Sequence, residues 1–492
     1  MADELIRLSA VAVRALLRRG EVTPGDLVEA AIDRIEAIDG TLNALPTRCF
    51  DRARTQAATL ALRETMLGGL PLVIKDNNEV GGVRSTGGTP IFADRVPAQS
   101  DRTVALIEAR GGITLAKSNL SELGGANTTN AVFGATRNPW NLALTCGGSS
   151  GGSAVALATG QAWLAHGNDL GGSLRIPASF CGVLGLRPGP GRIPRRALVN
   201  PFDTLFVDGP MARDVADLAL FFDAMVGFDP DDPLSAPSPD GPFLAAAQEP
   251  AKPARLAWST DLGCLPVADE VRTLGEAFAG AMGKAGIAVH HGAPDFRRAL
   301  PTLLALRGAS YLATWEPFLA DRRHLFTADV LSDIERGATQ SPSALAAAER
   351  YRADLYRRVM AFLDMHEILV APAVTTLPGP VEVMWPREIA GQKLDTYVDW
   401  IAITAVTSLL SCPILSLPVG FSADGLPFGV QLIGKPRSEA KLFRAAAWIE
   451  RHLGLKPAVI EPRGQVPVGG QARGVISPAA SPPSTLRTVP LT

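Results

Sequence analysis

The sequence predicts an α/β fold in which a mixed β-sheet core is flanked by helices on both faces and carries a helical cap-like region. Two patterns predict it. Short apolar runs typical of buried strands alternate with helical patterns along most of the chain, and residues 297–368 are mostly helical in pattern. With 492 residues, of which 47% are hydrophobic, the chain is long enough to bury a large core.

Residues 5–65 are expected to be helical, because apolar residues recur there at helical spacing. Thr23 and Pro24 predict the start of the second helix, with a capping hydroxyl followed by a proline at the first helical position. The apolar run 70–74 then predicts a buried strand that ends in Lys75 and Asp76. In open α/β sheets, chemistry is usually placed at this end of the strands.

Strands and helices are expected to alternate after this point. Helices are predicted at 103–110, 151–160, 211–227 and 271–284, and strands at 112–116, 163–166, 255–258 and 369–372. A loop is predicted at 375–393. Residues 465–492 are rich in Pro, Gly, Ser and Ala, which predicts a disordered or loosely attached tail after a single domain over 1–464.

Charge and cysteine content exclude several classes of function. The net charge is −2, which gives no long-range attraction to nucleic acid or to anionic membranes. The five cysteines are scattered, odd in number and without CxxC spacing. This argues against a disulfide scaffold or a zinc site and fits a reducing compartment. We therefore expect a cytoplasmic protein with no metal, no cofactor and no nucleic-acid partner.

One uncharged stretch, 401–421, is long enough to span a bilayer. It contains Pro413 and Pro418 and several hydroxyl side chains, so a buried helix that continues into a buried strand is the better interpretation. The N-terminus shows no basic segment followed by an apolar core, so no signal peptide is expected. No membrane partner is expected.

The densest functional signal lies in residues 145–182. Residues 147–153 read Gly-Gly-Ser-Ser-Gly-Gly-Ser, and residues 169–177 read Asp-Leu-Gly-Gly-Ser-Leu-Arg-Ile-Pro. Small residues beside each serine remove side-chain bulk, so that backbone N–H groups can point into a shared space, as an oxyanion hole requires. One such run is usually only a loop, but two runs together with Lys75 at a strand end indicate a catalytic site.

These motifs resemble the amidase signature family. The resemblance covers residues 65–225 well and residues 398–435 more loosely. Matching segments are 75–76, 147–153, 169–182, Asn130, 133–134, 138–141, 418–420 and 425–431. The resemblance implies one amidase signature domain over 1–464, with the core motifs in those two segments and a substrate-pocket or cap region at 297–400.

The resemblance implies a Ser–cis-Ser–Lys triad. In it Ser173 attacks the carbonyl, Ser149 follows a cis peptide bond and relays the proton, and Lys75 is the base. Elementary chemistry is consistent with this assignment. A serine hydroxyl is a poor nucleophile until a base takes its proton, and lysine can be that base only if burial lowers its pKa. The apolar strand that leads to Lys75 predicts such burial.

Supporting roles follow from the same resemblance. The oxyanion is expected to be held by the backbone N–H groups of Leu170, Gly171, Gly172 and Ser173. Asp169 and Arg175 flank the nucleophile and are expected to position its loop. Asp76 is assigned no catalytic role, because strand alternation points it to the face opposite Lys75.

Several nearby residues are assigned no chemistry. Cys146 could be a thiol nucleophile, but a small apolar loop residue is the better interpretation. His166 is expected to be a hydrogen-bonded structural histidine. Trp315, Phe318, Trp385 and Trp400 are candidates for a substrate pocket, with core packing as the alternative.

The resulting hypothesis is a hydrolase that cleaves amide C–N bonds through a covalent acyl-enzyme. We expect broad specificity for apolar or aryl amides, with ester and carbamate (urethane) cleavage by the same chemistry, in a monomer or homodimer. Two alternatives stay open. Residues 147–151 also match the G-x-S-x-G pattern of α/β-hydrolase esterases, in which Ser149 would be the nucleophile and His366 or His452 the base. The other alternative is an amidotransferase subunit.

Overall fold

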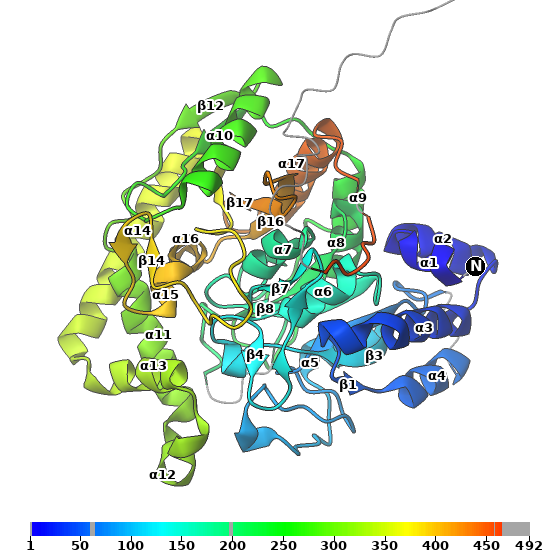
Figure 1. Ribbon diagram of the computed structural model, residues 1–492. Helices are drawn as coiled ribbons and strands as arrows, with labels where there is room; N and C mark the ends of the chain where they lie inside the picture. Colours follow the sequence, from blue (N-terminus) through cyan, green and yellow to red (C-terminus); the bar gives the residue numbers. More distant parts are fainter. Residues whose placement is uncertain (1, 60–63, 196–199, 457, 465–492) are drawn as a thin grey trace, which may run out of the picture.

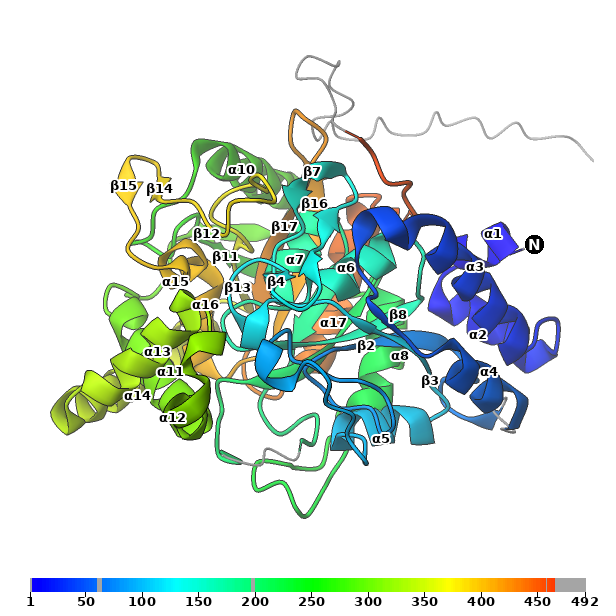
Figure 2. The ribbon, with the colours of Figure 1, turned by 60° about the horizontal axis from the view of Figure 1, so that its bottom comes forward.

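The computed structural model describes residues 2–59, 64–195, 200–456 and 458–464. A mixed eleven-stranded sheet runs through the molecule, with strand order β1-β3-β2-β8-β10-β9-β16-β17-β13-β11-β12 (Figures 1 and 2). In that order the strands are β1 Thr47–Arg48, β3 Ile113–Ser118, β2 Pro71–Lys75, β8 Leu164–Asp169, β10 Val207–Ala212, β9 Leu184–Arg187, β16 Ile414–Phe421, β17 Pro427–Ile433, β13 Ile368–Pro372, β11 Arg255–Trp258 and β12 Ala288–His291. Both parallel and antiparallel pairs occur.

Helices flank the sheet on both faces, which confirms the predicted fold class (Figures 1 and 2). The larger helices are α1 Ala2–Arg7, α2 Ala10–Arg19, α3 Pro24–Leu42, α4 Phe50–Thr59, α5 Arg102–Ala109, α6 Gly151–Ala158, α7 Arg175–Cys181, α8 Val215–Met225, α9 Phe243–Gln248, α10 Asp269–Lys284, α11 Ala299–Trp315, α13 Ala328–Thr339, α14 Pro342–Met365 and α17 Glu439–His452. Short helices are α12 Leu319–Arg322, α15 Tyr397–Trp400 and α16 Ala402–Ala405. The described residues also form three two-stranded ribbons: β4 Thr129–Asn130 with β5 Gly134–Ala135, β6 Arg137–Asn138 with β7 Asn141–Thr145, and β14 Glu388–Ile389 with β15 Gln392–Lys393.

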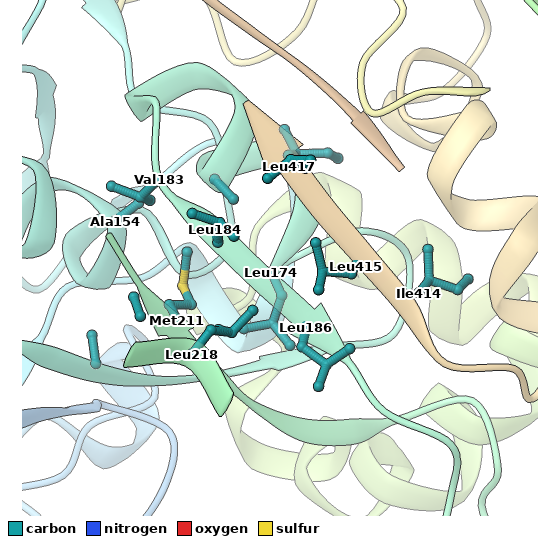
Figure 3. Packing of buried hydrophobic residues seen from close by; sticks show 14 of the residues in the cluster. Ala154, Leu174, Val183, Leu184, Leu186, Met211, Leu218, Ile414, Leu415 and Leu417 are labelled. Carbon is teal, nitrogen blue, oxygen red and sulfur yellow. The ribbon is translucent and has the colours of Figure 1, made fainter. Parts of the chain in front are cut away.

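The sheet brings two functional segments to the same edge. Strands β2 and β8 are parallel neighbours, so their carboxyl ends lie together. Lys75 is the last residue of β2 and Asp169 the last residue of β8. The turn that follows β8 packs on the hydrophobic core, because Leu174 is buried among apolar side chains that include Leu186 and Leu218 (Figure 3).

The region expected to be mostly helical forms a separate layer. Helix α11 packs against α13 and α14, and Figure 2 shows these helices at the end of the molecule opposite α1–α4. The N-terminal helices also agree with the sequence pattern. Helix α3 begins at Pro24, and Thr23 and Asp26 form a reciprocal capping box.

Some expected element boundaries are wrong. A helix was expected from residue 211, but β10 extends to Ala212 and α8 begins only at Val215. Strand β10 is held by pairing with β8 and β9, which are distant in sequence, and local periodicity does not detect such pairing. The expected loop at 375–393 contains the ribbon β14–β15. The predicted tail lies outside the described residues.

The uncharged stretch 401–421 forms short buried helical turns followed by β16, as expected. Within the ranges that the structure describes, no helix has the length and apolar character needed to cross a membrane.

Candidate active site

A cavity of about 400 Å³ lies at the edge of the sheet where β2 and β8 end. Ser149 and Ser173 both line it, and Lys75 is fully buried beside it. Lys75 ends β2, Ser149 lies just before α6, and Ser173 lies in the turn between β8 and α7. The fold thus gathers the three predicted catalytic side chains from three segments of the chain.

Lys75 is in direct contact with the first serine. Its Nζ lies 2.6 Å from Ser149 Oγ and donates a hydrogen bond to Asn168 Oδ1 at 2.7 Å. Burial lowers the pKa of Lys75 to about 7, although the charges of Asp169 and Asp208 act in the opposite direction. A lysine with this pKa is partly neutral near pH 7, so its lone pair can accept a proton from Ser149.

The two serine-bearing segments lie against each other. The Ser150 N–H donates to the Ser173 carbonyl at 3.2 Å. The peptide bond between Gly148 and Ser149 is cis, as the sequence resemblance implied. A side chain at Gly148 would bring a Cβ within 2.1 Å of the Ala126 carbonyl oxygen, so only glycine fits at this position.

The turn 170–173 carries backbone N–H groups next to the Ser173 side chain. The Gly172 N–H donates to Asp169 Oδ1 at 2.9 Å, so this group holds the turn together. The other three groups, those of Leu170, Gly171 and Ser173, have no hydrogen-bond acceptor among the described residues. Of the four N–H groups expected to form an oxyanion hole, these three are therefore the ones without an acceptor among the described residues.

Asp169 and Arg175 form the core of a buried ion network behind the turn. Arg175 donates to both Asp169 oxygens, at 3.0 and 2.9 Å. It also donates to Thr407 Oγ1, Gln431 Oε1 and Ser408 Oγ. Burial alone would raise the pKa of Asp169, but Arg175 and Arg187 hold it well below its usual range. This network ties the turn 170–173 to β9, β17 and the segment before β16.

Most of the chain matches a known protein family. A family model described as Amidase matches residues 26–443, which is most of the chain. The chain belongs to the amidase signature family. This amidase is therefore an enzyme that hydrolyses amide C–N bonds.

Relatives and solved structures agree over nearly the full length. The acylamidase of Rhodococcus erythropolis is 31% identical over 460 residues, which cover 90% of this chain and 95% of that protein. A glutamyl-tRNA(Gln) amidotransferase subunit from Moorella thermoacetica is 33% identical, with 91% of this chain and 97% of that protein covered. A bacterial aryl acylamidase structure matches with a TM-score of 0.84 and 27% identity, with 90% of this chain and 96% of that chain covered. The 6-aminohexanoate cyclic dimer hydrolase gives 0.82 and 28%, with 93% and 99% covered.

Sequence reasoning missed one residue that touches the lysine of the amidase. Asn168 accepts from Lys75 and donates through Nδ2 to the side-chain oxygens of Asn77 at 2.8 Å and Asn78 at 3.0 Å. Two asparagines directly after Lys75-Asp76 and a third directly before Asp169 were the available signal. Their meaning emerges only once β2 and β8 are known to be neighbours.

Asp76, Cys146 and His166 lie near the site, and the sequence analysis assigns them no part in catalysis. Asp76 accepts a hydrogen bond from Thr86 and pairs with buried Lys117 at 3.4 Å. It therefore does not pair with Lys75 and stabilise its protonated form. Burial raises the pKa of Cys146 to about 12, which keeps it a thiol. The expectation for His166 is wrong in one respect. It is fully buried in β8, but neither ring nitrogen has a hydrogen-bond partner among the described residues.

The cavity lining combines an apolar wall of aromatic rings with charged side chains. Phe92, Trp315 and Phe318 form the apolar wall, and the rings of Phe92 and Phe318 meet edge to face at 5.5 Å. The lining also includes the acidic side chains Asp101, Asp203 and Asp208 together with Arg102 and Arg195. Trp385 and Trp400, which were also considered for the pocket, are buried in the apolar core instead.

Proposed function

We propose that this amidase hydrolyses apolar or aryl amides through a covalent acyl-enzyme, with Ser173 as nucleophile, Ser149 as proton relay and Lys75 as base. The observation that carries the proposal is the 2.6 Å contact between Lys75 Nζ and Ser149 Oγ, beside a cavity that Ser173 also lines. The lowered pKa of Lys75 supports the role of base.

The steps follow from this arrangement. Ser173 Oγ attacks the amide carbon while its proton moves to Ser149, whose own proton moves to Lys75 Nζ. The free N–H groups of the turn stabilise the oxyanion. The protonated relay then donates to the leaving amine, and the acyl-enzyme forms. Water attacks the ester with the same groups acting in reverse, which releases the acid and restores Ser173.

The apolar wall supports the choice of substrate. Helix α11 and the residues after it supply Trp315 and Phe318, so the region 297–400 contributes to substrate selection in the single domain that we propose for 1–464. An aryl or alkyl group packed on these rings would be removed from water. The same attack of Ser173 on a carbonyl carbon would also cleave esters and carbamates. The unpaired cysteines support our proposal that the enzyme acts in the cytoplasm.

The esterase alternative is disfavoured by the partner of Ser149. That partner is Lys75, and the described residues that line the cavity include no histidine. His366 stacks on His290 at 4.6 Å, and His452 stacks on Trp448 at 4.7 Å. Neither is placed to serve as a base for Ser149.

The amidotransferase alternative is favoured by relatives with that name, which reach 33% identity. An amidotransferase subunit of this kind would release ammonia from glutamine and would work with partner subunits. The three aromatic rings of the cavity wall fit a small polar amide poorly. Glutaminase activity of the purified chain, or a partner that copurifies with it, would establish this second function.

Covalent labelling tests the triad directly. After treatment with a small sulfonyl fluoride, tandem mass spectrometry is expected to find the modification on Ser173, and Lys75→Ala is expected to abolish the labelling because the serine then lacks its base. Modification of Ser149 instead would favour the esterase mechanism. An intact folded protein with no label would remove Ser173 from the role of nucleophile.

The pH dependence tests the state of Lys75. Because the base must be neutral, kcat/KM for an aryl amide is expected to rise with pH and to level off above the lysine pKa of about 7. The sign is opposite for a mechanism that needs a protonated lysine, where activity would fall across the same range. Steady-state rates from pH 5 to 9 separate the two.

A further inference from the structure

Asp208 is a buried carboxylate beside the catalytic cavity that no step of the proposed mechanism uses. Its side chain is 2% exposed, and the residue lines the cavity. It lies on β10 directly opposite Asn168 of β8. Directly opposed residues of antiparallel strands project from the same face of a sheet, so Asp208 and Asn168 share a face.

A chain of hydrogen bonds connects Asp208 to Lys75. Asn78 Nδ2 donates to Asp208 Oδ2 at 3.3 Å, Asn168 Nδ2 donates to Asn78 Oδ1 at 3.0 Å, and Lys75 Nζ donates to Asn168 Oδ1 at 2.7 Å. Thr103 Oγ1 also donates to Asp208 Oδ2, at 2.7 Å. The chain is buried over most of its length.

The carboxylate sets the direction of this chain. An ionised carboxylate only accepts hydrogen bonds, so Asn78 must turn its NH₂ group toward Asp208 and its oxygen toward Asn168. Asn168 must then turn its NH₂ group toward Asn78 and its oxygen toward Lys75. With one lysine N–H held by that oxygen, the lone pair of neutral Lys75 is free to face Ser149. The orientations of the Asn78 and Asn168 amide groups thus follow from Asp208 at the far end of the chain.

The charge of Asp208 has no strong counter-ion nearby. It forms no ion pair with an arginine or lysine in the described part of the chain, and its Oδ1 has no hydrogen-bond partner there. His166 Nε2 lies 3.7 Å from that oxygen. Burial would raise the pKa of Asp208, but His166, Thr103 and Arg195 lower it below its ordinary value, so the group is ionised near pH 7.

The other charges around Lys75 are already matched. Asp169 is paired with Arg175 and Arg187, and Asp76 is paired with Lys117 on the neighbouring strand β3. Within the described ranges, Asp208 is therefore the acid near Lys75 that has no arginine or lysine partner. A negative charge near a buried lysine favours its protonated form and makes it a stronger base.

We infer that Asp208 is a positioning residue of the amide hydrolysis, which acts through Asn78 and Asn168 to hold the lone pair of Lys75 toward Ser149. The inference rests on the proposed triad. Two consequences can be measured separately. The charge of Asp208 affects the pH at which Lys75 becomes neutral, and its hydrogen-bond acceptors affect the orientation of the lysine.

Two variants separate charge from orientation. Asp208→Asn keeps an acceptor oxygen and loses the charge, so the acidic limb of kcat/KM is expected to move to lower pH by about one unit, with a smaller change in kcat on the plateau. Asp208→Leu loses both, so the limb should move similarly and kcat on the plateau should fall by a further factor of about ten or more, with KM little changed.

Asp101→Asn is the matched control. Asp101 lines the same cavity and accepts from the Glu79 N–H at 2.8 Å, and burial raises its pKa to about 6. Among the described residues it has no hydrogen bond to Lys75, Asn78 or Asn168, and its charge interacts with that of Asp208 only through space, so its variant is expected to leave the acidic limb in place. If Asp101→Asn moves the limb as far as Asp208→Asn does, the effect belongs to the total charge of the cavity and the inference is overturned.

Lys75→Ala distinguishes this inference from the proposed function. If Lys75→Ala is inactive while both Asp208 variants keep the wild-type pH profile and kcat, the triad stands and the positioning role is wrong. If Lys75→Ala retains activity, the triad fails and the inference fails with it. Circular dichroism of each variant shows whether a loss reflects unfolding instead, and Asp208→Asn, which is nearly isosteric, provides the test if Asp208→Leu does not fold.

Discussion

Replacing Ser173 by alanine is expected to lower kcat for an aryl amide by about 10⁴-fold or more, because the variant has no atom that can form the acyl-enzyme. Binding and oxyanion stabilisation would survive, since both use backbone groups and the cavity walls. The Ser173 side chain is only half-buried, and the loss of its hydroxyl leaves the hydrogen bond from Ser150 to the Ser173 carbonyl intact. We therefore expect a folded, inactive protein with substrate affinity largely preserved.

Ser310→Ala provides the comparison for this variant. Ser310 also lines the cavity, but on α11, and its hydroxyl donates to Asp203 at 3.3 Å rather than to a group of the triad. Its kcat should stay close to the wild-type value. Both variants can be assayed for amine release and checked by circular dichroism. A Ser173→Ala enzyme that keeps more than a few per cent of wild-type kcat would rule out Ser173 as the nucleophile.

Arg175→Met is expected to reduce the free energy of unfolding by about 3–5 kcal/mol, which is typical when one partner of a buried ion pair is removed. Arg175 is fully buried, and its loss leaves Asp169 with Arg187 as its remaining cation at 3.3 Å. The oxygens of Gln431 and Thr407 lose the same donor. Urea unfolding followed by tryptophan fluorescence measures the effect. Activity should fall as well, because Asp169 holds the nucleophile turn.

The exposed pair of Arg297 and Asp295 supplies a control. Both side chains are solvent-accessible, so Arg297→Met should leave the unfolding midpoint almost unchanged.

The pH dependence of stability provides a further check on the pair of Arg175 and Asp169. The pKa of folded Asp169 lies below its ordinary value of 3.8, so its ion pairs contribute stability above that pH and lose it as the pH falls further. The difference in the free energy of unfolding between wild type and Arg175→Met should therefore shrink on acidification. Equal stability at neutral pH would contradict the structural role of the pair.

The site residues divide into those that local patterns reveal and those that they do not. Lys75, Ser149 and Ser173 lie in short-range features, the glycine-serine runs and an apolar strand end, and the resemblance of these motifs to the amidase signature family implied their roles. Asn168 and Asp208 were missed, although both are ordinary polar residues near the motifs. The contact of Asn168 with Lys75 depends on the pairing of β2 with β8, and the place of Asp208 depends on the pairing of β8 with β10. The sequence pattern around residue 211 pointed to a helix rather than to the end of β10.

The sequence by itself determined the fold class and the alternation of strands and helices, because hydrophobic periodicity acts over a few neighbours. It also contained the motifs whose resemblance to the amidase signature family implied the three residues proposed for the triad. The tertiary structure decided the burial that lowers the pKa of Lys75, the aromatic wall of the cavity, and the chain of amides that ends at Asp208. These properties depend on which strands lie side by side. The free energy of a buried charge is set by groups contributed by several strands, and no single segment of the chain contains them all.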